Sequence, residues 1–410
     1  MSDTVVPTLD ELQAARELVA AVANVTPMEE SRYLSNVLGS PVLLKCENLQ
    51  RTGSYKIRGA YNRMARLTPE ERARGVVAAS AGNHAQGVAL AARELGINAT
   101  IFMPVGVALP KLQATRSYGA DVILRGHSVD EPLRAAAEFA ESTGSILIPP
   151  FDHLDIITGQ GTLGLEILDQ VPDVETVVVP IGGGGLIAGI ASAVKQRAAL
   201  EGRTIRVIGV QAENSAPYPR SLEAGEPVEI RMKPTIADGI AVSKPGALNF
   251  AIIRDLVDDI VTVSDDETAQ ALLVLLERAK LVVEPAGAVA VAAIVTGKVE
   301  NRGKTVAVLS GGNIDPQVME RVISLGLAAS DRYLKLRVKL PDRPGQLARI
   351  AELISDANAN VIEVSHARNG RGALLGEVEL ELSLETRGPE HVQRVLDHLR
   401  EADYDPRTEY

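Results

Sequence analysis

The sequence contains very little cysteine and few aromatic residues, and it has no tryptophan. Cys46 is the single cysteine among 410 residues, so the chain cannot form an internal disulfide, and we expect a reducing compartment. Aromatic residues make up only 3% of the chain, so its core must be built from aliphatic side chains. A chain of this length is expected to form roughly two or three domains.

Long apolar runs and an excess of basic charge are also missing. The longest apolar run, residues 282–295, is interrupted by Glu284, Pro285 and Gly287, so we expect no membrane-spanning helix. The first residues are acidic and lack the positive start and apolar stretch of a signal peptide. The net charge of −11 argues against a nucleic-acid partner, which needs a clustered basic surface. These absences favour a folded, cytoplasmic protein with no membrane or nucleic-acid partner.

Between about residues 40 and 325, short β-branched runs alternate with longer amphipathic segments. Runs such as ETVVVPI and TVAVLS predict strands buried on both faces, and segments such as HAQGVALAARELG predict the helices between them. This alternation indicates βαβ units and mostly parallel sheets, hence an α/β fold. Several strands lead directly into glycine-rich turns, and ligands of such folds bind at that end of the sheet.

The pattern changes after about residue 328. A strictly alternating strand, a helix, two more strands, a second helix and a last short strand follow. This order predicts a compact ferredoxin-like βαββαβ unit with an antiparallel sheet. We therefore expect a large α/β body over residues 1–328 and a small domain over residues 329–410.

The sharpest local signal is the stretch VVVPIGGGGLIAGIASAV, in which a strand enters four glycines and a helix leaves them. Glycines let the backbone approach an anion closely, and a helix N-terminus offers unpaired N–H groups, so residues 182–186 predict a phosphate site. The same stretch also fits the G-x-G-x-x-A pattern of dinucleotide-binding proteins, with Glu213 about where a ribose ligand would lie. On local grounds, a dinucleotide-dependent oxidoreductase is therefore an alternative.

Three further turns and a lysine accompany this loop. Lys56 follows a glycine–serine turn, residues 80–84 and Ser310 each follow a predicted strand, and Glu284 precedes a predicted helix start. A lysine held in a closed pocket can lose its proton and form a Schiff base with an aldehyde. Together with a phosphate loop, these residues predict a pocket for a phosphorylated aldehyde.

Six motifs occur in order between about residues 5 and 325: TGSYKIRGA, SAGNHAQG, PIGGGGLIAG, TIADGIAV, VEPAGA and SGGNID. This set closely resembles the threonine dehydratases (threonine ammonia-lyases), members of the β-family, or fold type II, of pyridoxal-phosphate enzymes, to which serine racemase is related. The resemblance implies a two-lobed body whose small lobe, at about 51–150, is inserted into the larger one. The tail, with its turn PDRPGQL, resembles a single ACT domain, an amino-acid-binding regulatory module.

The resemblance also assigns site residues. Lys56 would carry the cofactor, pyridoxal 5′-phosphate, and act as the catalytic base. Asn83 would bind the ring hydroxyl, and Ser310 would face the pyridine nitrogen. The remaining cofactor contacts that it implies are Tyr55, Gly182, Gly183, Gly184, Gly185, Leu186 and Glu284. The residues that it places at the substrate carboxylate are Ser80, Ala81, Gly82, Asn83 and His84.

The implied reaction is deamination of L-threonine to 2-oxobutanoate and ammonia by elimination of the β-hydroxyl, the entry step of isoleucine biosynthesis. Serine racemases carry a second acid/base where this chain has Ala81, which cannot carry a proton, so elimination is favoured over racemisation. L-Serine also has a β-hydroxyl, and one methyl group provides only about 1–3 kcal/mol of discrimination. An L-serine dehydratase with racemase side activity is therefore the alternative enzyme.

The resemblance extends to ligands and partners. An ACT domain favours a regulated pathway enzyme, with isoleucine or valine as the effector, and family members are usually dimers or tetramers. We therefore expect a homodimer or homotetramer. Gln211 and Pro217 stand where serine racemase has metal ligands, and no histidine pair has metal-ligand spacing with a carboxylate, so no metal site is expected.

Overall fold

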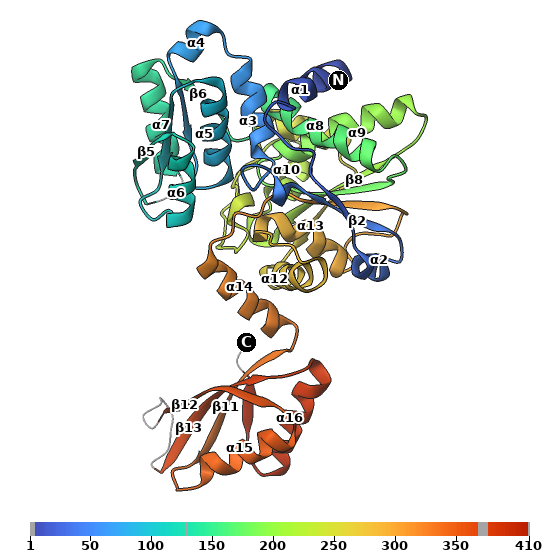
Figure 1. Ribbon diagram of the computed structural model, residues 1–410. Coiled ribbons are helices and arrows are strands. Elements are labelled where there is room, and N and C mark those ends of the chain that lie inside the picture. Colours follow the sequence, from blue (N-terminus) through green and yellow to red (C-terminus); the bar gives the residue numbers. More distant parts are fainter. Residues whose placement is uncertain (1–4, 128–129, 368–375, 409–410) are drawn as a thin grey trace. The chain divides into compact units, whose positions relative to one another are not determined.

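The computed structural model describes residues 5–127, 130–367 and 376–408, and the chain divides into two compact units, Met1–Met319 and Glu320–Tyr410. The division falls inside α14 (Pro316–Ala329), and the boundary expected from the sequence, at residue 328, lies near the end of this helix. The first unit contains two separate sheets, each with its own helices, and we refer to these two layers as its large and small lobes (Figure 1).

The large lobe is built on a six-stranded sheet with the order β1-β2-β10-β7-β8-β9. Its strands are β1 (Met28–Glu30), β2 (Val42–Cys46), β7 (Thr176–Pro180), β8 (Arg206–Ala212), β9 (Asp259–Val263) and β10 (Thr305–Leu309). Only β1 runs antiparallel to its neighbour, and the other pairs are parallel. All residues of β7 and β10 are buried, which explains why both read as continuous apolar runs.

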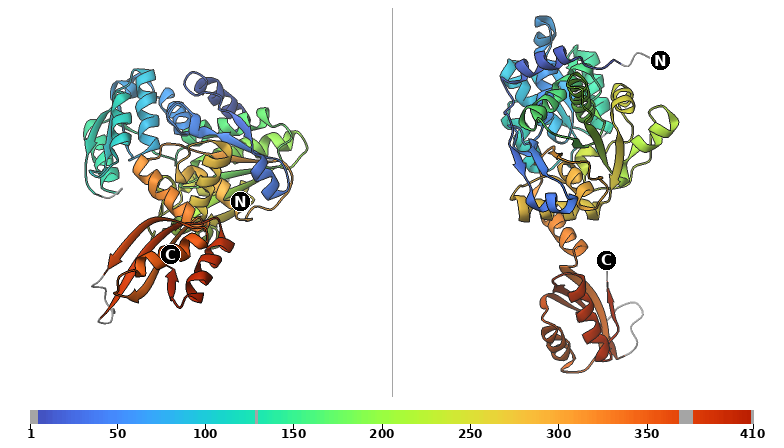
Figure 2. Two further views of the ribbon diagram at one scale, coloured as in Figure 1. Left: turned by 60° about the horizontal axis from the view of Figure 1, so that its bottom comes forward. Right: turned by 90° about the vertical axis from the view of Figure 1, so that its right-hand side faces the viewer.

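The small lobe has a four-stranded parallel sheet with the order β5-β4-β3-β6. Its strands are β3 (Val76–Ala79), β4 (Ala99–Met103), β5 (Asp121–Leu124) and β6 (Ile146–Leu147). Helices α5 (Asn83–Leu95), α6 (Leu109–Ser117) and α7 (Asp130–Thr143) gather with this sheet on one side of the unit (Figures 1 and 2). All the residues of this lobe lie between the first and last strands of the large sheet in the sequence.

The remaining helices of the first unit cover the large sheet or join the lobes. They are α1 (Leu9–Val19), α2 (Arg32–Leu38), α3 (Lys56–Ala65), α4 (Pro69–Ala73), α8 (Leu154–Gln170), α9 (Gly185–Leu200), α10 (Pro217–Ala224), α11 (Ala247–Leu256), α12 (Asp265–Val274) and α13 (Pro285–Val295). Short helical turns occur at η1 (Glu47–Leu49), η2 (Glu213–Ser215) and η3 (Asp238–Ile240), and a π-helical turn, η4 (Leu275–Ala279), follows α12.

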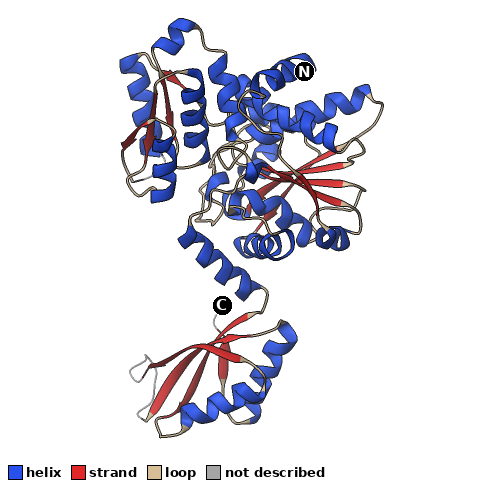
Figure 3. Cartoon of the chain, in the orientation of Figure 1, coloured by secondary structure: helices blue, strands red, loops and turns tan. Residues whose placement is uncertain are grey.

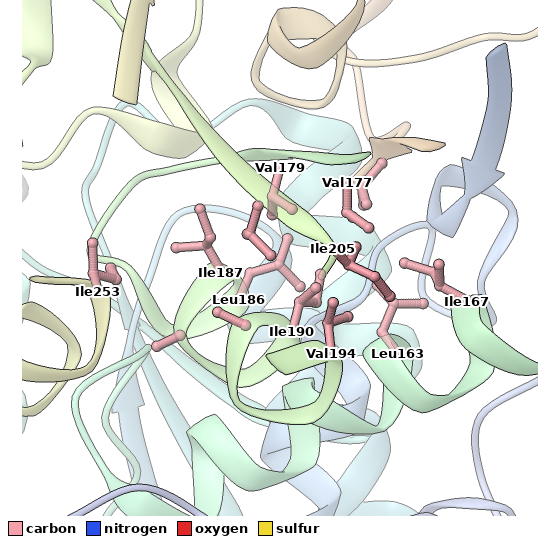
Figure 4. Close-up of a cluster of buried hydrophobic side chains, with 14 of the residues drawn as sticks. Leu163, Ile167, Val177, Val179, Leu186, Ile187, Ile190, Val194, Ile205 and Ile253 are labelled. Atoms are coloured by element: carbon pink, nitrogen blue, oxygen red, sulfur yellow. The ribbon is translucent and has the colours of Figure 1, made fainter. Parts of the chain in front are cut away.

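The main core of the large lobe lies between its sheet and the helices α8 and α9. Figure 4 shows aliphatic side chains of this core, among them Leu163, Val177 and Ile190, and the same cluster includes only two aromatic residues, Tyr218 and Phe250. The two helices approach closely because glycines face each other: a Cβ at Gly189 would lie 2.4 Å from the carbonyl oxygen of Ile157. This close packing fixes the start of α9, where the glycine loop ends.

The second unit is an antiparallel sheet with two helices on one face (Figures 1 and 3). Its elements, in chain order, are β11 (Tyr333–Pro341), α15 (Gln346–Asp356), β12 (Asn360–Ala367), β13 (Glu377–Glu385), α16 (Pro389–Glu401) and β14 (Pro406–Thr408). Alternate residues of β11, from Leu334 to Leu340, are buried against the helices. The predicted βαββαβ unit and the α/β body are both confirmed.

No helix in the described part of the chain is long and apolar enough to span a membrane.

Candidate active site

Apart from Glu284, which is the N-cap of α13, the residues predicted to form the site lie after the carboxyl ends of three adjacent strands, β2, β10 and β7, and of β3 in the small lobe. Because the strands are parallel, the segments that follow them meet at one edge of the large sheet. The backbone of this region is directly connected: Ser54 forms an antiparallel bridge with Gly311, and the N–H of Tyr55 donates to the carbonyl oxygen of Ser310 at 3.2 Å. The structure thus brings the segment before Lys56 against the turn after β10.

Lys56 is the first residue of α3 and is partly buried between the lobes. Its Nζ donates to the carbonyl oxygen of Pro150 at 2.9 Å and lies 5.3 Å from the centre of the Tyr55 ring. Burial lowers the pKa of the Lys56 amine to about 8, although the nearby Glu284 carboxyl opposes this shift. A substantial fraction of the amine is therefore neutral near physiological pH.

The glycine loop (Gly182–Leu186) joins β7 to α9. Gly184 is the N-cap of α9 with φ of +102°, and a Cβ there would lie 2.1 Å from the hydroxyl of Tyr218, so only glycine fits. At Gly183 a Cβ would lie 2.4 Å from the ring of Phe151. None of the described residues accepts a hydrogen bond from the N–H groups of this loop. Unpaired amides at the N-terminus of a helix suit a phosphate group.

The turn after β3 carries the residues predicted for the substrate carboxylate. The Oγ of Ser80 accepts from the N–H of Gly82 at 3.1 Å, and α5 begins at Asn83. His84 is buried, and its Nε2 lies 2.9 Å from the carbonyl oxygen of Ile148. Burial, with a smaller contribution from Lys56, lowers the pKa of His84 to about 3. The imidazole is therefore neutral, and its Nε2–H donates to Ile148.

Asn83 links the two lobes through its side-chain amide. Its Nδ2 donates to Oε1 of Glu284 at 2.6 Å, and its Oδ1 accepts from Nδ2 of Asn313 at 2.8 Å. Asn313 also donates to the carbonyl oxygen of Thr52 at 2.7 Å. Glu284 is buried at the N-cap of α13, and burial raises its pKa to about 7. The Asn83 amide keeps its second N–H available for a ligand.

Ser310 directly follows β10 and is buried, and its hydroxyl forms no hydrogen bond with the described residues. A hydroxyl at this place can face a ring nitrogen without protonating it, since serine is not an acid at neutral pH. The side chains of Lys56, Asn83, Glu284 and Ser310 thus belong to one region with the glycine loop. These residues fit a phosphorylated pyridine aldehyde: an amine, an amide, a hydroxyl and a set of unpaired N–H groups.

Some residues of the site were not predicted from the sequence. Lys111, on α6, forms an ion pair of 3.2 Å with Asp238, which lies on η3 of the large lobe. A Cβ at Gly82 would lie 4.0 Å from the Lys111 Nζ, so this cation lies beside the N-terminus of α5. A lysine on an amphipathic helix resembles an ordinary surface residue, and no local pattern distinguishes it. Tyr218, Asn249 and Phe151, which contact the glycine loop, were also not predicted, because no local sequence pattern distinguishes them from other residues of the chain.

A buried cluster of four charged side chains includes Arg58, which lies on α3 two residues after Lys56. We call it the ion cluster, and its members are Lys45, Glu47, Arg58 and Glu166. Arg58 donates to both oxygens of Glu47 at 2.8 Å and forms a 2.8 Å ion pair with Oε2 of Glu166. Lys45 donates to Oε1 of Glu166 at 2.6 Å. The four side chains are at most 7% exposed. The cluster joins β2, η1, α3 and α8, and it contains two charges of each sign.

Metal ligands are not gathered in the same way. Among the described residues, no group of three or more His, Cys, Asp or Glu side chains has an arrangement that could hold a metal ion. Gln211 is fully buried, and its Oε1 accepts from the N–H of Tyr218 at 3.1 Å. Pro217 begins α10. Both residues thus have structural roles in this chain.

Comparison with protein families gives two matches along the chain. The model of the pyridoxal-phosphate dependent enzymes matches residues 19–311, and the model of the ACT domain matches residues 335–403. The first match includes the glycine loop, so the dinucleotide interpretation of that loop is wrong.

Similar proteins include two named L-threonine ammonia-lyase. The one from Geobacter sulfurreducens is 47% identical over 394 residues, covering 96% of this chain and 97% of the relative. The one from Thermotoga maritima is 48% identical over 389 residues, covering 95% and 96%. Among solved structures, threonine deaminase isoform 2 from Solanum lycopersicum has a TM-score of 0.72 and 40% identity, covering 78% of this chain and 90% of that one. Maize serine racemase has a TM-score of 0.73 and 34% identity, covering 79% and 99%.

Proposed function

Since the chain belongs to the family of pyridoxal-phosphate dependent enzymes and carries a C-terminal ACT domain, we propose that it is an L-threonine ammonia-lyase. It would convert L-threonine to 2-oxobutanoate and ammonia. The observation that carries this proposal is the position of Lys56, whose amine with lowered pKa lies in one region with the glycine loop and Ser310. Identities of 47% and 48% with two L-threonine ammonia-lyases, over both units, support the substrate.

Pyridoxal phosphate is the cofactor of this family, and the residues of the site fit it. The glycine loop would hold the phosphate, Ser310 would face the pyridine nitrogen, and Asn83 and Glu284 would lie along the ring beside Tyr55. When bound, the cofactor withdraws electrons from the bonds at the Cα of the amino acid and so makes loss of its proton possible. The protein supplies orientation and electrostatics around it.

Lys56 would hold the cofactor and then take the proton from Cα of the substrate. A base works best when its pKa lies near the working pH, and burial brings the Lys56 amine to about 8. The neutral hydroxyl of Ser310 cannot keep the pyridine nitrogen protonated, which makes the ring a moderate electron acceptor. Held opposite such a hydroxyl, the cofactor would supply only moderate electron withdrawal, which would suit expulsion of the β-hydroxyl better than transfer of the amino group.

The turn at residues 80–84 would bind the substrate carboxylate through the first N–H groups of α5. Lys111 adds a positive charge beside this helix start. His84 contributes as a neutral, buried side chain that holds the turn against Ile148. Ala81 offers no group that could return a proton to the opposite face of Cα, so the product is the 2-oxo acid and not the D-amino acid.

We further propose that the ACT domain binds a branched-chain amino acid, isoleucine or valine, and regulates the catalytic unit. The pathway position at the entry to isoleucine biosynthesis supports an end-product effector of this kind. A homodimer or homotetramer in the cytoplasm is the assembly and location that we propose, and the buried free thiol of Cys46 is consistent with a reducing compartment.

The experiment that tests this proposal is an assay of 2-oxo acid release by the purified, cofactor-saturated protein, with L-threonine and L-serine as separate substrates. We expect release of 2-oxobutanoate from L-threonine with the higher kcat/KM. A higher kcat/KM for L-serine would replace the threonine assignment with the serine dehydratase alternative. Inertness toward both substrates would refute the ammonia-lyase proposal. Titration of isoleucine and valine into the same assay tests the regulatory part separately.

A further inference from the structure

The carbonyl oxygen of Gly183, in the middle of the glycine loop, accepts three hydrogen bonds. The Oη of Tyr218 donates to it at 3.1 Å and Nδ2 of Asn249 at 3.0 Å. The backbone N–H of Gly246 is a third donor, at 3.3 Å. The donors come from α10, from α11 and from the residue before α11. One carbonyl of the loop is therefore held from two helices that lie outside it.

This carbonyl controls the direction of the next N–H group. The peptide bond between Gly183 and Gly184 is trans, as are the other described peptide bonds, so the N–H of Gly184 points away from the Gly183 oxygen. The oxygen is held toward Tyr218 and Asn249. The N–H of Gly184 is therefore held on the opposite side, as one of the loop amides that lack an acceptor.

Tyr218 is itself held firmly. It is fully buried, its backbone N–H donates to Oε1 of Gln211, and its hydroxyl occupies the space that a side chain at Gly184 would need. Burial raises the pKa of the Tyr218 phenol, so the hydroxyl keeps its proton and remains a donor throughout the physiological range. Asn249 is fully buried as well, and α11 is fixed by the carboxylate of Asp152, which accepts from its first N–H groups.

We propose that Tyr218 and Asn249 are positioning residues for the cofactor phosphate. By holding the Gly183 carbonyl, they orient the Gly183–Gly184 peptide and thereby set the affinity of the glycine loop for a phosphate group. This inference rests on the proposed function, in which the loop holds the phosphate of pyridoxal phosphate. Neither residue touches the reacting atoms of the substrate; each acts through the Gly183 peptide.

The test compares two ligands that differ only in the phosphate group. The full chain is freed of cofactor, and dissociation constants for pyridoxal 5′-phosphate and for pyridoxal are measured by absorbance titration. Tyr218→Phe removes one donor and keeps the ring. We expect it to raise the dissociation constant for pyridoxal phosphate about tenfold and to leave that for pyridoxal nearly unchanged.

Tyr61→Phe is the matched control, since Tyr61 is also buried but lies in the core of the small lobe. It should change neither dissociation constant. Asn249→Asp is the second variant: it keeps the shape of the side chain and replaces the donor by an acceptor. It should weaken binding of pyridoxal phosphate more strongly than Tyr218→Phe, and it serves as the decisive variant if Tyr218→Phe does not fold.

The outcomes separate this inference from the proposed function. If the wild-type protein binds both ligands equally well, the loop is not the phosphate site, and the cofactor arrangement under the proposed function fails. If the wild type prefers pyridoxal phosphate and both variants keep that preference in full, only the positioning role is overturned. Equal weakening for both ligands would also overturn it, because it would indicate general damage to the fold.

Discussion

The ion cluster of Lys45, Glu47, Arg58 and Glu166 provides a stability prediction that can be worked out from the structure. Glu166 is its most connected member: Oε1 accepts from Lys45 and from the N–H of Thr26, and Oε2 pairs with Arg58. Glu166→Gln keeps the shape and removes one negative charge, which leaves two buried cations against Glu47 alone. Removing one partner of a buried ion pair costs about 3–5 kcal/mol, and we expect a loss of this size in the free energy of unfolding.

The loss of unfolding free energy in Glu166→Gln should become smaller as the pH rises, because of the titration of Lys45. Burial already lowers the pKa of Lys45, and without Glu166 the pKa of its folded state falls further. In the variant, Lys45 then has a lower pKa in the folded chain than in the unfolded chain. At pH values between these two pKa values, the unfolded chain binds more protons than the folded chain. The free energy of unfolding consequently rises with pH in that window, because the Lys45 amine of the folded protein loses its proton and with it the uncompensated charge. The deficit of Glu166→Gln should therefore be smaller at pH 9 than at pH 7.

Urea denaturation of the full chain, followed by far-ultraviolet circular dichroism, measures both effects. The midpoint of the variant should fall by on the order of 1 M or more at pH 7. The control is Glu201→Gln, which removes a carboxylate paired with Arg197 and Arg203 on the surface, and its midpoint should not change measurably. A loss no larger than that of the control would refute the reasoning. A large loss that is identical at pH 7 and pH 9 would show that charge is not its cause.

Three further predictions concern the site. In the cofactor-free protein, the rate at which an acylating reagent modifies the Lys56 amine should rise with pH and reach half its maximum near pH 8. The reason is that burial lowers the pKa of this amine to about 8, and only the neutral amine reacts. A midpoint near pH 10 would contradict the burial argument. Lys111→Met should raise the KM for L-threonine about tenfold without lowering the urea midpoint, since a cation beside the start of α5 is lost; an unchanged KM would remove Lys111 from the site. Ala81→Ser should gain D-amino acid formation detectable by chiral chromatography, and no trace of it would count against the role of this position.

Much of the fold could be predicted because the central strands of its sheets are buried on both faces. In β7 and β10 all side chains are apolar or small, so each strand is recognised without knowledge of its neighbours. The glycine loop could be predicted for a related reason, since a strand, four glycines and a helix are consecutive. In the second unit, the alternation of β11 revealed both the strand and its one buried face.

Contacts between distant segments could not be predicted in this way. Lys45 lies in β2, where a lysine is expected to face solvent, yet it is fully buried because α8 supplies Glu166. Tyr218 and Asn249 lie on separate helices, and their shared acceptor is a backbone oxygen that no sequence pattern marks. The strand order is a further example, since the pairing of β2 with β10 depends on how the whole unit closes.

The pairing of β2 with β10 has a consequence for how the protein is made. The Thr52 carbonyl near Lys56 is held by Asn313, 261 residues later in the chain, and Ser54 is bridged to Gly311. A ribosome has to synthesise nearly the whole first unit before these contacts can form. Contacts of such long sequence separation also form slowly. A nascent or truncated chain that stops before β10 therefore lacks these contacts to the segment that carries Lys56, and this part of the site can be completed only when synthesis of the first unit is nearly finished.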